Sequence, residues 1–544
     1  MQVNAQATRR SGGLAYKWLV AMVVIVGVFM SILDQTIVNI AIPRLQAAFG
    51  ADIHSVQWVL TAYILTLGVV TPTSAFFASK LGIKRYYIIS LAAFTAGSAL
   101  CGLAWNLPVL IFFRILQGIG GAALFPMSIT LLFREFPPHE RGTAMGFFGI
   151  PALLGPALGP TLGGYLVTYA DWQAIFYINV PVGIVGIMFA SAILREVREE
   201  TRARFDFWGF LFAAVGLGSL LYALSDASTD GWMSTKVLGF LLVGALCLII
   251  FIVLELVIAN REGSPLLDLR LFRNGPFRNS TIANLFVVFS LFGGIFLLPI
   301  YLQNIRQLSA FQTGLLLLPQ ALASMVSVVI GGRLVDRLGA RAVMIPGLLI
   351  LAFVTWQLSF TTVDSPYWWL QTMFIIRGFA LGACIQPLTV VGLSEIGPRQ
   401  LAQASSINTV TRSVSSSLGI AVLATLVQTQ SQVHFARLAE QVTASSPTGR
   451  LVAAFQAALV ARGADLNTAH TTALQLIARF IQRQSFVLAL QNGFTFSLVI
   501  AFLAIIAVFF VRSSRKPGRA SGAPRPQGEP TAEHEETQAL ALVE

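Results

Sequence analysis

The fold is decided first by residues 18–43, which read WLVAMVVIVGVFMSILDQTIVNIAIP. This stretch is apolar almost throughout and carries a single charged residue, Asp34. About 20 apolar residues suffice for a helix to cross about 30 Å of hydrocarbon, so the stretch predicts a membrane-spanning helix. A charge at the bilayer centre costs about 3 kcal/mol or more, which makes Asp34 a candidate functional residue.

The whole chain has the composition of a polytopic membrane protein. Of its 544 residues, 56% are hydrophobic and 11% are charged, whereas about 25% of residues are charged in soluble domains. The net charge of +12 would suit a nucleic-acid binder. The basic residues, however, cluster in loops on one side of the predicted membrane, and we therefore expect no nucleic-acid partner.

The three cysteines all lie in apolar runs without Cys-x-x-Cys spacing: Cys101, Cys247 and Cys384. We expect neither disulfides nor a metal site from them, and interpret them as small buried hydrophobic residues.

Apolar segments of spanning length recur along the chain, separated by charged, Gly or Pro loops, and predict an all-α membrane fold. There are about fourteen: 17–42, 55–77, 85–105, 108–133, 143–168, 174–194, 206–225, 236–258, 279–302, 311–333, 342–362, 367–391, 401–427 and 487–511.

Basic residues predict the orientation. The short loops on one side hold only Arg44, Lys236 and Arg306, while the loops on the other side are rich in Lys and Arg. Because cytoplasmic loops carry the excess of basic residues, both termini are expected in the cytoplasm. The expected location is the plasma (inner) membrane.

Five parts of the chain are expected. They are a cytoplasmic N-terminal tail (1–16), a six-helix half (17–200), two inserted transmembrane helices (201–262), a second six-helix half (263–511) and a disordered cytoplasmic tail (512–544). Within the second half, 428–484 is amphipathic and is expected outside the membrane. It is either a helical hairpin for partner contact or a solvated loop, and we favour the loop.

The two halves resemble each other. FFASKLGIKRYYI at 76–88 matches GGRLVDRLGARAVM at 331–344, which aligns Gly82 with Gly339 and Ser79 with Asp336. In each half a later segment begins with Arg and continues through Gly to Pro: RILQGIGGAALFP at 114–126 and RGFALGACIQP at 377–387. Repeated halves with a site between them are typical of secondary transporters.

Acidic residues are rare inside the predicted spans. Of 24 Asp and Glu, only Asp34 lies well within one, and Glu255 lies near the end of the eighth. No His is embedded. Asp34 is therefore the first candidate for carrying a proton, and the alternative is a structural carboxylate that hydrogen-bonds a neighbouring helix.

Three arginines are embedded: Arg114, with Gln117 one turn on, Arg377, and Arg412, with Asn408 one turn before it. Each needs partners in hydrocarbon. For Arg114 a coupling role is favoured over interhelical bonding, while for Arg377 and Arg412 bonding is at least as good an interpretation.

Small residues and prolines mark the fifth segment, and no ATP-binding motif occurs. Gly at four-residue spacing allows close helix packing and Pro permits a bend, so both a packing face and a hinge are expected from Gly155, Pro156, Gly159, Pro160, Gly163 and Gly164. The glycines at 118–122 lie mid-span without a preceding strand, and no Gly-x4-Gly-Lys-Ser/Thr occurs, which leaves an ion gradient as the energy source.

At these motifs the chain resembles the major facilitator superfamily, and within it the fourteen-helix drug:proton antiporters of the EmrB/QacA type. The resemblance covers nearly the whole chain. It rests on LDQTIVNIAIP (33–43), RILQGIGGAA (114–123), LGPALGPTLGG (154–164), FYINVPVG (176–183), DLRLFRN (268–274) and LAQASSINTVTR (401–412). It implies the major facilitator fold, two six-helix halves plus two central helices.

The resemblance also implies roles for particular residues. The first-helix acid and fourth-helix Arg of such proteins act in proton coupling or cation recognition, which falls on Asp34 and Arg114, with Gln117 and Asn39 as further candidates. Loop residues control the switch between inward-open and outward-open states, and they correspond to Gly82, Lys84, Arg85, Asp336, Arg337, Gly339 and Arg341. Candidates for the cavity of the second half are Arg377, Asn408 and Arg412.

The chain departs from the family pattern at four positions. Ser79 stands where the family has Asp, and Ala75 where it has Gly. Gln173 and Ala174 stand where Arg and Trp are usual. The gate of the first half is therefore expected to differ from the family pattern.

The sequence thus predicts a proton-coupled antiporter that exports small amphipathic compounds by alternating access. It is expected to need no cofactor beyond the proton gradient and to be no enzyme. The alternatives are a dedicated exporter of one endogenous product, such as an antibiotic, lipid or siderophore, and, less favoured, a membrane protein that does not transport. In Gram-negative relatives a periplasmic adaptor participates, so such a partner is expected only in a host of that kind.

Overall fold

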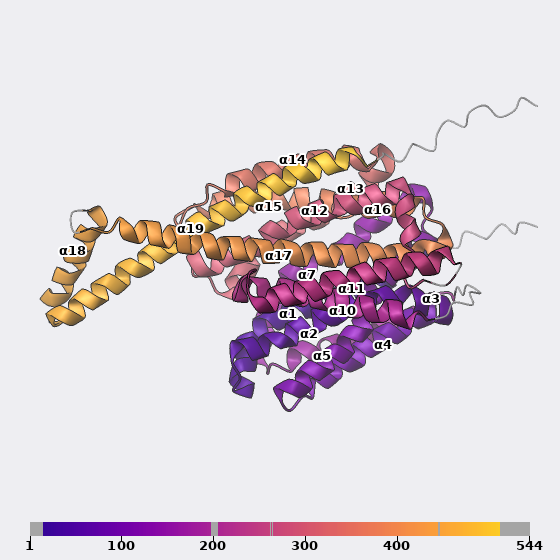
Figure 1. The fold of residues 1–544 in the computed structure, drawn as a ribbon, viewed down its shortest axis with the longest axis horizontal. Helices are drawn as coiled ribbons and strands as arrows, with labels where there is room; N and C mark the ends of the chain where they lie inside the picture. Colours follow the sequence, from indigo (N-terminus) through magenta and orange to yellow (C-terminus); the bar gives the residue numbers. More distant parts are fainter. Residues whose placement is uncertain (1–14, 197–204, 262, 264, 444–445, 512–544) are drawn as a thin grey trace, which may run out of the picture.

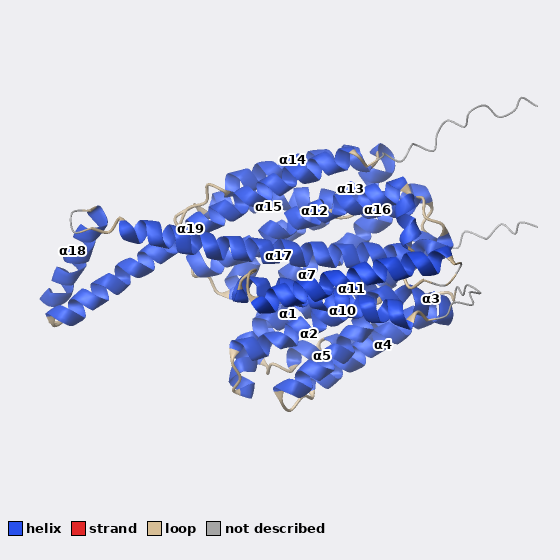
Figure 2. Ribbon diagram, in the orientation of Figure 1, coloured by secondary structure: helices blue, strands red, loops and turns tan. Residues whose placement is uncertain are grey.

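The computed structural model describes residues 15–196, 205–261, 263, 265–443 and 446–511. The predicted tail 512–544 and most of the predicted tail 1–16 lie outside these residues. Every regular element in the described part of the chain is helical (Figure 2).

The first half contains nine α-helices: α1 (Tyr16–Phe49), α2 (Ile53–Val70), α3 (Ser74–Leu81), α4 (Ile83–Gly102), α5 (Leu107–Gly121), α6 (Leu124–Glu135), α7 (Arg141–Tyr169), α8 (Ala174–Tyr177) and α9 (Asn179–Ile193). Two helices follow, α10 (Phe207–Asp230) and α11 (Thr235–Asn260).

The second half contains α12 (Gly275–Ile300), α13 (Ala310–Leu338), α14 (Ala340–Leu358), α15 (Tyr367–Cys384), α16 (Pro387–Ser394), α17 (Leu401–Glu440), α18 (Pro447–Ala461) and α19 (Leu466–Phe509). The inserted α10 packs on α11 and also contacts α2 of the first half and α17 of the second (Figure 1).

Twelve helices of the described chain are long and apolar enough to span a membrane, or thirteen if the bent α7 is counted as one span. The predicted segment 85–105 corresponds to α4, a 20-residue helix that is not apolar enough to meet the same standard. The fourteen predicted passes are reached only when both α4 and α7 are counted. This is a multi-pass membrane protein.

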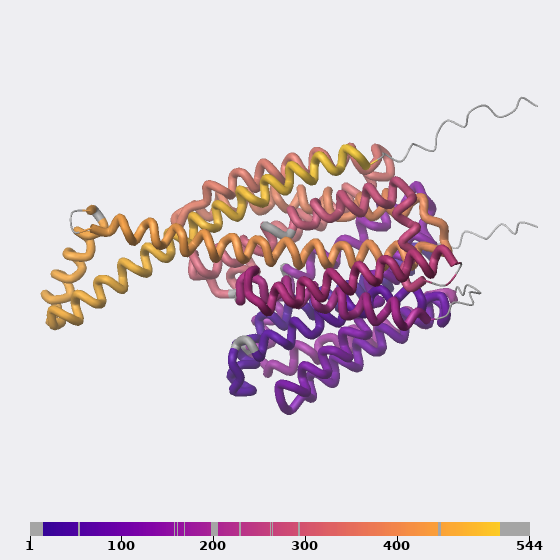
Figure 3. Tube along the Cα trace, in the orientation of Figure 1, coloured from indigo at the N-terminus to yellow at the C-terminus, as the bar shows by residue number. Residues whose placement is uncertain are grey.

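The prediction that 428–484 is a solvated loop is wrong, because the segment is helical over almost all of its described length. Helix α17 continues to Glu440 and α19 already begins at Leu466, so that both helices extend past the bundle and meet α18 in a projection (Figures 1 and 3). Apolar residues at four-residue spacing, Ala473, Ile477 and Ile481, form a small core with Val452 of α18. The segment has too few apolar residues to cross a membrane, but those it has are enough to hold the helices of the projection together.

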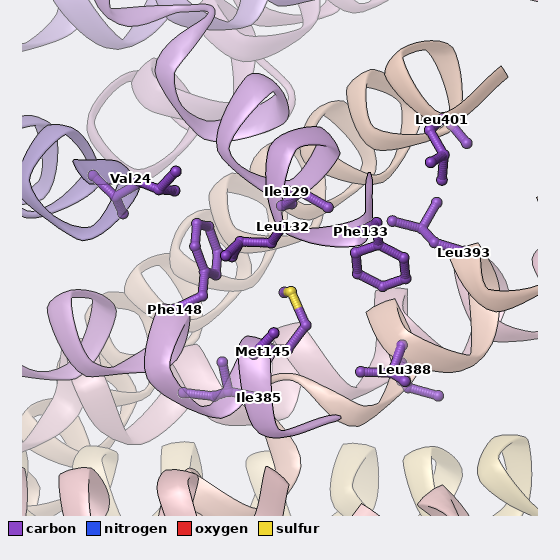
Figure 4. Close-up of a cluster of buried hydrophobic side chains, with 14 of the residues drawn as sticks. Val24, Ile129, Leu132, Phe133, Met145, Phe148, Ile385, Leu388, Leu393 and Leu401 are labelled. Carbon is purple, nitrogen blue, oxygen red and sulfur yellow. The ribbon is translucent and has the colours of Figure 1, made fainter. Parts of the chain in front are cut away.

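Three hydrophobic cores arrange the two halves. One contains residues of both halves, including Phe148 of α7 and Leu388 of α16 (Figure 4). The other two each belong to one half, around Ile37 of α1 and around Leu298 of α12. The first part of α1 contributes to the shared core and its later part to a separate one. The halves are therefore joined by a common core at one end of the bundle, and each has its own core at the other.

Candidate functional site

Asp34 lies in the middle of α1 and is 1% exposed. Its carboxylate accepts three hydrogen bonds. Arg114 Nη1 of α5 lies 2.6 Å from Oδ2, Gln117 Nε2 of α5 lies 2.9 Å from Oδ1, and Asn179 Nδ2 of α9 lies 3.0 Å from Oδ1. Three hydrogen-bond donors and one opposite charge thus meet at a single buried carboxylate.

Arg114 is fully buried and is held from several sides. Its Nε donates to the Val59 carbonyl at 3.0 Å, and its Nη1 also donates to Gln117 Oε1 at 2.7 Å. The guanidinium lies 4.1 Å from the ring centroid of Tyr63, which adds a cation–π contact. Its Nη2 has no hydrogen-bond partner among the described residues. One donor of this buried cation is thus unused.

A second layer holds these side chains in place. Ser31 Oγ and the Tyr63 hydroxyl lie 3.2 Å apart, and Asn179 Nδ2 lies 3.1 Å from Ser98 Oγ. The Cys101 thiol lies 3.6 Å from Gln117 Oε1, so this cysteine is a weak donor as well as a small buried residue. We call Asp34, Tyr63, Arg114, Gln117 and Asn179 the Asp34 cluster.

Glycine allows the helices of the cluster to approach. A Cβ on Gly97 of α4 would lie 2.6 Å from the Gln117 Cα of α5, closer than real atoms pack. The N-cap of α5 is Asn106, whose side chain accepts from the Val109 amide at 2.9 Å. Close packing of α4 on α5, with a fixed start for α5, positions Arg114 and Gln117 toward α1.

The structure brings three of the four predicted coupling residues together and leaves Asn39 out. Asp34, Arg114 and Gln117 contact one another, whereas the Asn39 side chain is exposed and donates to the Gln35 carbonyl one turn back. Five residues along a helix correspond to a rotation of about 140° away from Asp34. Asn39 therefore makes no contact with Asp34, and its role in coupling or substrate binding stays a prediction.

The sequence interpretation missed Asn179 and Tyr63 as members of the cluster. Asn179 is a polar residue in the apolar run FYINVPVG and is 1% exposed. A buried amide needs a partner, so its polarity was a usable signal. Tyr63 gave no such signal, because aromatic residues are common in spanning helices.

The candidates of the second half do not share one contact network. Arg377 of α15 is 1% exposed and donates to the Leu291 carbonyl of α12 at 3.1 Å. Asn408 accepts from Asn284 Nδ2 at 3.2 Å and donates to Thr389 Oγ1 at 3.2 Å.

The third candidate, Arg412, lies with its guanidinium carbon 5.9 Å from the Phe125 ring centroid of the first half. Arg377 thus bonds to a backbone carbonyl where Arg114 meets a carboxylate.

The two repeated loops have the same backbone. Gly82 ends α3 with φ 88° and ψ 151°, and Gly339 ends α13 with φ 87° and ψ 158°. Positive φ of this kind favours glycine, so the aligned glycines are required by the same turn in both halves. The internal repeat inferred from the sequence is present here at the level of backbone angles.

Asp336 joins the halves. Its Oδ1 accepts from the Gly142 amide at 2.7 Å, and its Oδ2 accepts from the Thr143 amide at 2.8 Å and from Thr143 Oγ1 at 2.6 Å. These donors lie at the N-terminus of α7, where a carboxylate is favoured by the free amides and the helix dipole. In the other loop, Ser79 Oγ bonds to the Phe76 carbonyl of its own helix at 2.8 Å. In these two loops the bonds between halves come from Asp336, and Ser79 supplies none.

The other loop candidates act within their own half or face outward. Lys84 Nζ donates to the Ser191 carbonyl at 2.7 Å, and the Arg85 amide donates to Glu196 Oε2 at 3.2 Å. Arg341 bonds to the Val511 carbonyl, and Arg337 is exposed.

The glycine motif of α7 packs against α1. A Cβ on Gly155 would lie 2.5 Å from Ile32, and one on Gly159 would lie 2.2 Å from Thr36 Oγ1. Gly163 also faces α1, whereas Gly164 faces open space. The chain bends by 41° between the segments Pro138–Pro156 and Thr161–Val167, so the bend falls within α7 where Pro156 and Pro160 occur in the sequence. The expected close packing is present and the helix is bent, whereas movement at this bend, the expected hinge, stays a prediction.

Comparisons with known proteins agree with this architecture. The Major Facilitator Superfamily matches residues 24–420. The uncharacterized MFS-type transporter YhcA of Bacillus subtilis (strain 168) is 32% identical over 91% of this chain and 93% of its own. The multidrug resistance protein B homolog of Mycobacterium tuberculosis (strain ATCC 25618 / H37Rv) is 33% identical over 74% of each chain.

A third relative is the tetracenomycin C resistance and export protein of Streptomyces glaucescens, which is 31% identical over 77% of this chain and 78% of its own. Among solved structures, the human organic anion transporter MFSD10 (TETRAN) superposes with a TM-score of 0.61 at 13% identity, over 91% of this chain and all of that one. At that identity the superposition shows the fold alone. The chain belongs to the Major Facilitator Superfamily.

Proposed function

We propose that this chain is a proton-coupled exporter that moves amphipathic, cationic or neutral compounds out of the cytoplasm by alternating access. One observation carries the proposal: a fully buried carboxylate, Asp34, is ion-paired with Arg114 inside the membrane-spanning part of the protein. Embedded ionisable groups of this kind are typical of proton and ion pathways. Relatives named for multidrug resistance supply the class of cargo.

Asp34 can couple a proton to a change in contacts. When the carboxylate is ionised, it holds Arg114 and Gln117 of α5 and Asn179 of α9. Protonation removes the charge that balances the buried guanidinium, so Arg114 must then find another partner or move. A proton at Asp34 therefore favours a different arrangement of α1 against α5 and α9, which is what exchange requires.

Exchange also requires two access states. The shared core and the Asp336 contacts join the halves at the end of the bundle that carries the repeated Gly82 and Gly339 loops. The basic residues of these loops place that end in the cytoplasm by the positive-inside rule. On this orientation the described state is closed toward the cytoplasm, both termini are cytoplasmic, and the protein resides in the plasma (inner) membrane.

The test uses inside-out vesicles from cells that express the full chain, with the fluorescent cation ethidium as probe. Ethidium uptake should need a proton gradient, should stop when a protonophore is added, and should not need ATP. Asp34→Asn, which keeps the shape and removes the charge, should abolish uptake. Asp364→Asn, an exposed carboxylate in the loop before α15, should not. Uptake that survives the protonophore would contradict the proposal.

A dedicated exporter of one endogenous product is the second candidate, favoured by the relative named for tetracenomycin C resistance and export. Because both candidates use the same coupling, the panel of substrates separates them. Uptake of several unrelated cations supports multidrug export, and uptake restricted to one chemical type supports the dedicated exporter.

A further inference from the structure

Two carboxyl groups meet at the base of the inserted helices, away from the Asp34 cluster. Asp206 is the N-cap of α10, and its Oδ1 accepts from the Gly209 amide at 2.8 Å. Glu255 lies in the last turns of α11 and is 0% exposed. A Cβ on Gly209 would lie 2.2 Å from Asp206 Oδ2 and 3.0 Å from Glu255 Oε1, so both carboxyl groups lie against the same point.

Each carboxyl group has one oxygen without a partner. Glu255 Oε1 accepts from the Leu266 amide at 3.2 Å, while Glu255 Oε2 and Asp206 Oδ2 are buried and have no hydrogen-bond partner among the described residues. A buried oxygen without a donor costs about 1–3 kcal/mol, and more when it is charged. Two carboxyl groups packed against the same glycine, each with a buried oxygen that lacks a donor, indicate that a donor is supplied there.

No cation faces the pair within the part of the chain that the structure describes. The charged groups that act on Glu255 are Asp206 and Asp268, both acidic. The basic residue of this region is Arg270, and it is already bound to Asp268 through Nε at 2.9 Å and Nη2 at 3.0 Å. The pair is therefore not neutralised by an ion pair.

From this geometry we infer that Asp206 and Glu255 hold one proton between them and form a second titratable site in the protein. Two carboxylates packed against one glycine disfavour each other's charge, and one proton held by the pair removes this repulsion. A proton supplies the donor that the lone oxygens lack. Among the described residues, no group of three or more His, Cys, Asp or Glu side chains comes together in a way that could hold a metal ion.

The shared proton ties the start of α10 to the end of α11. Loss of the proton puts two negative charges at one point and pushes these helix ends apart. The inserted hairpin is thus predicted to loosen as the pH rises, because loss of the shared proton leaves two like charges against one glycine.

The test is infrared spectroscopy of the full-length protein in lipid, titrated from mildly acidic to alkaline pH. Wild type should show a protonated-carboxyl band at neutral pH that disappears on alkalinisation. Glu255→Gln and Asp206→Asn should each lack this band, because an amide replaces one member of the pair. Asp34→Asn should keep it, which separates this site from the coupling site and leaves the result independent of the proposed function.

Thermal unfolding over the same pH range provides a second readout. Wild-type stability should fall as the pH rises, and Glu255→Gln should be less sensitive, since its amide can donate to Asp206 without titrating. If one variant fails to fold, the other and the wild-type titration still decide the question. An unchanged band in Glu255→Gln would overturn the inference, as would stabilisation of wild type, but not of the variants, by Ca²⁺ or Na⁺.

Discussion

Removal of the Asp336 carboxylate should open the end of the bundle at which the halves are joined. Asp336 accepts three hydrogen bonds from Gly142 and Thr143 across the boundary between the halves, at distances of 2.6–2.8 Å. A charge-assisted hydrogen bond contributes about 1.5–3 kcal/mol and a helix N-cap about 1 kcal/mol, and these overlap here. A total of about 2–4 kcal/mol corresponds to a shift of roughly 30- to 700-fold in the equilibrium between closed and open states.

The assay is the rate at which a water-soluble maleimide labels Ser405→Cys in a background without the three native cysteines. Ser405 lies on α17, is fully buried and is 3.3 Å from Thr130 Oγ1 of the first half, so labelling requires the halves to separate. Asp336→Asn should raise the rate, and Asp336→Ala should raise it further, because Asn keeps one acceptor oxygen. Arg462→Gln, an exposed residue at the end of α18 and outside these loops, is the control. A rate in Asp336→Ala within about two-fold of the parent would refute the reasoning, since that ratio is worth less than 0.5 kcal/mol.

Three further predictions concern other parts of the chain. Ser79→Asp adds a carboxylate where the first half lacks one, and this carboxylate should cap α17 and stabilise the closed state by about 1 kcal/mol. Labelling of Ser405→Cys should then slow by about five-fold, and an unchanged rate would show that the new carboxylate does not reach α17. Gly159→Val should lower thermal stability by about 1–3 kcal/mol because its Cβ would overlap α1, whereas Gly164→Ala, which faces open space, should not, and equal effects would argue against close packing. Hydrogen bonds from the side chain and amide of Thr468 lower the pKa of Asp465 at the start of α19, so its contribution is present above the ordinary carboxyl pKa of about 3.9 and is lost as the pH falls. The protection of the Thr468 amide against hydrogen exchange, measured relative to its intrinsic rate, should fall on acidification, and in Asp465→Ala it should not depend on pH.

Composition predicted the membrane helices well because the hydrocarbon core demands a long apolar run. The same criterion failed at 428–484, where helices form outside any such run. Helix formation there depends on contacts among α17, α18 and α19, such as the packing of Val452 on Ile477. Hydropathy along the sequence carries no information on contacts between helices.

The rarity of charged residues inside the predicted spans was enough to predict part of the candidate site. Charged groups in hydrocarbon are costly unless they are paired, so the sequence alone indicated Asp34 and Arg114 as functional candidates. Asn179 contacts Asp34 across 145 residues of sequence, and Tyr63 stacks on Arg114 from another helix. Such contacts depend on how helices rotate and pack, which a single sequence does not specify.

The hydrogen-bond partner of Arg377 could likewise not be predicted from the sequence. The sequence showed two arginines at matching places in the repeat, and the structure gives one of them a carboxylate and the other the Leu291 carbonyl. This asymmetry supports the proposal that the coupling residue lies in the first half.

The central claim is that Asp34 carries the proton that is exchanged for substrate. The most direct measurement is drug-driven proton release from inside-out vesicles that contain wild type or Asp34→Asn at equal expression. Wild type should release protons when ethidium is added, and Asp34→Asn should release none while remaining folded and present in the membrane. Release at the wild-type level from Asp34→Asn would contradict the claim and leave the Asp34 cluster a structural contact between α1, α5 and α9.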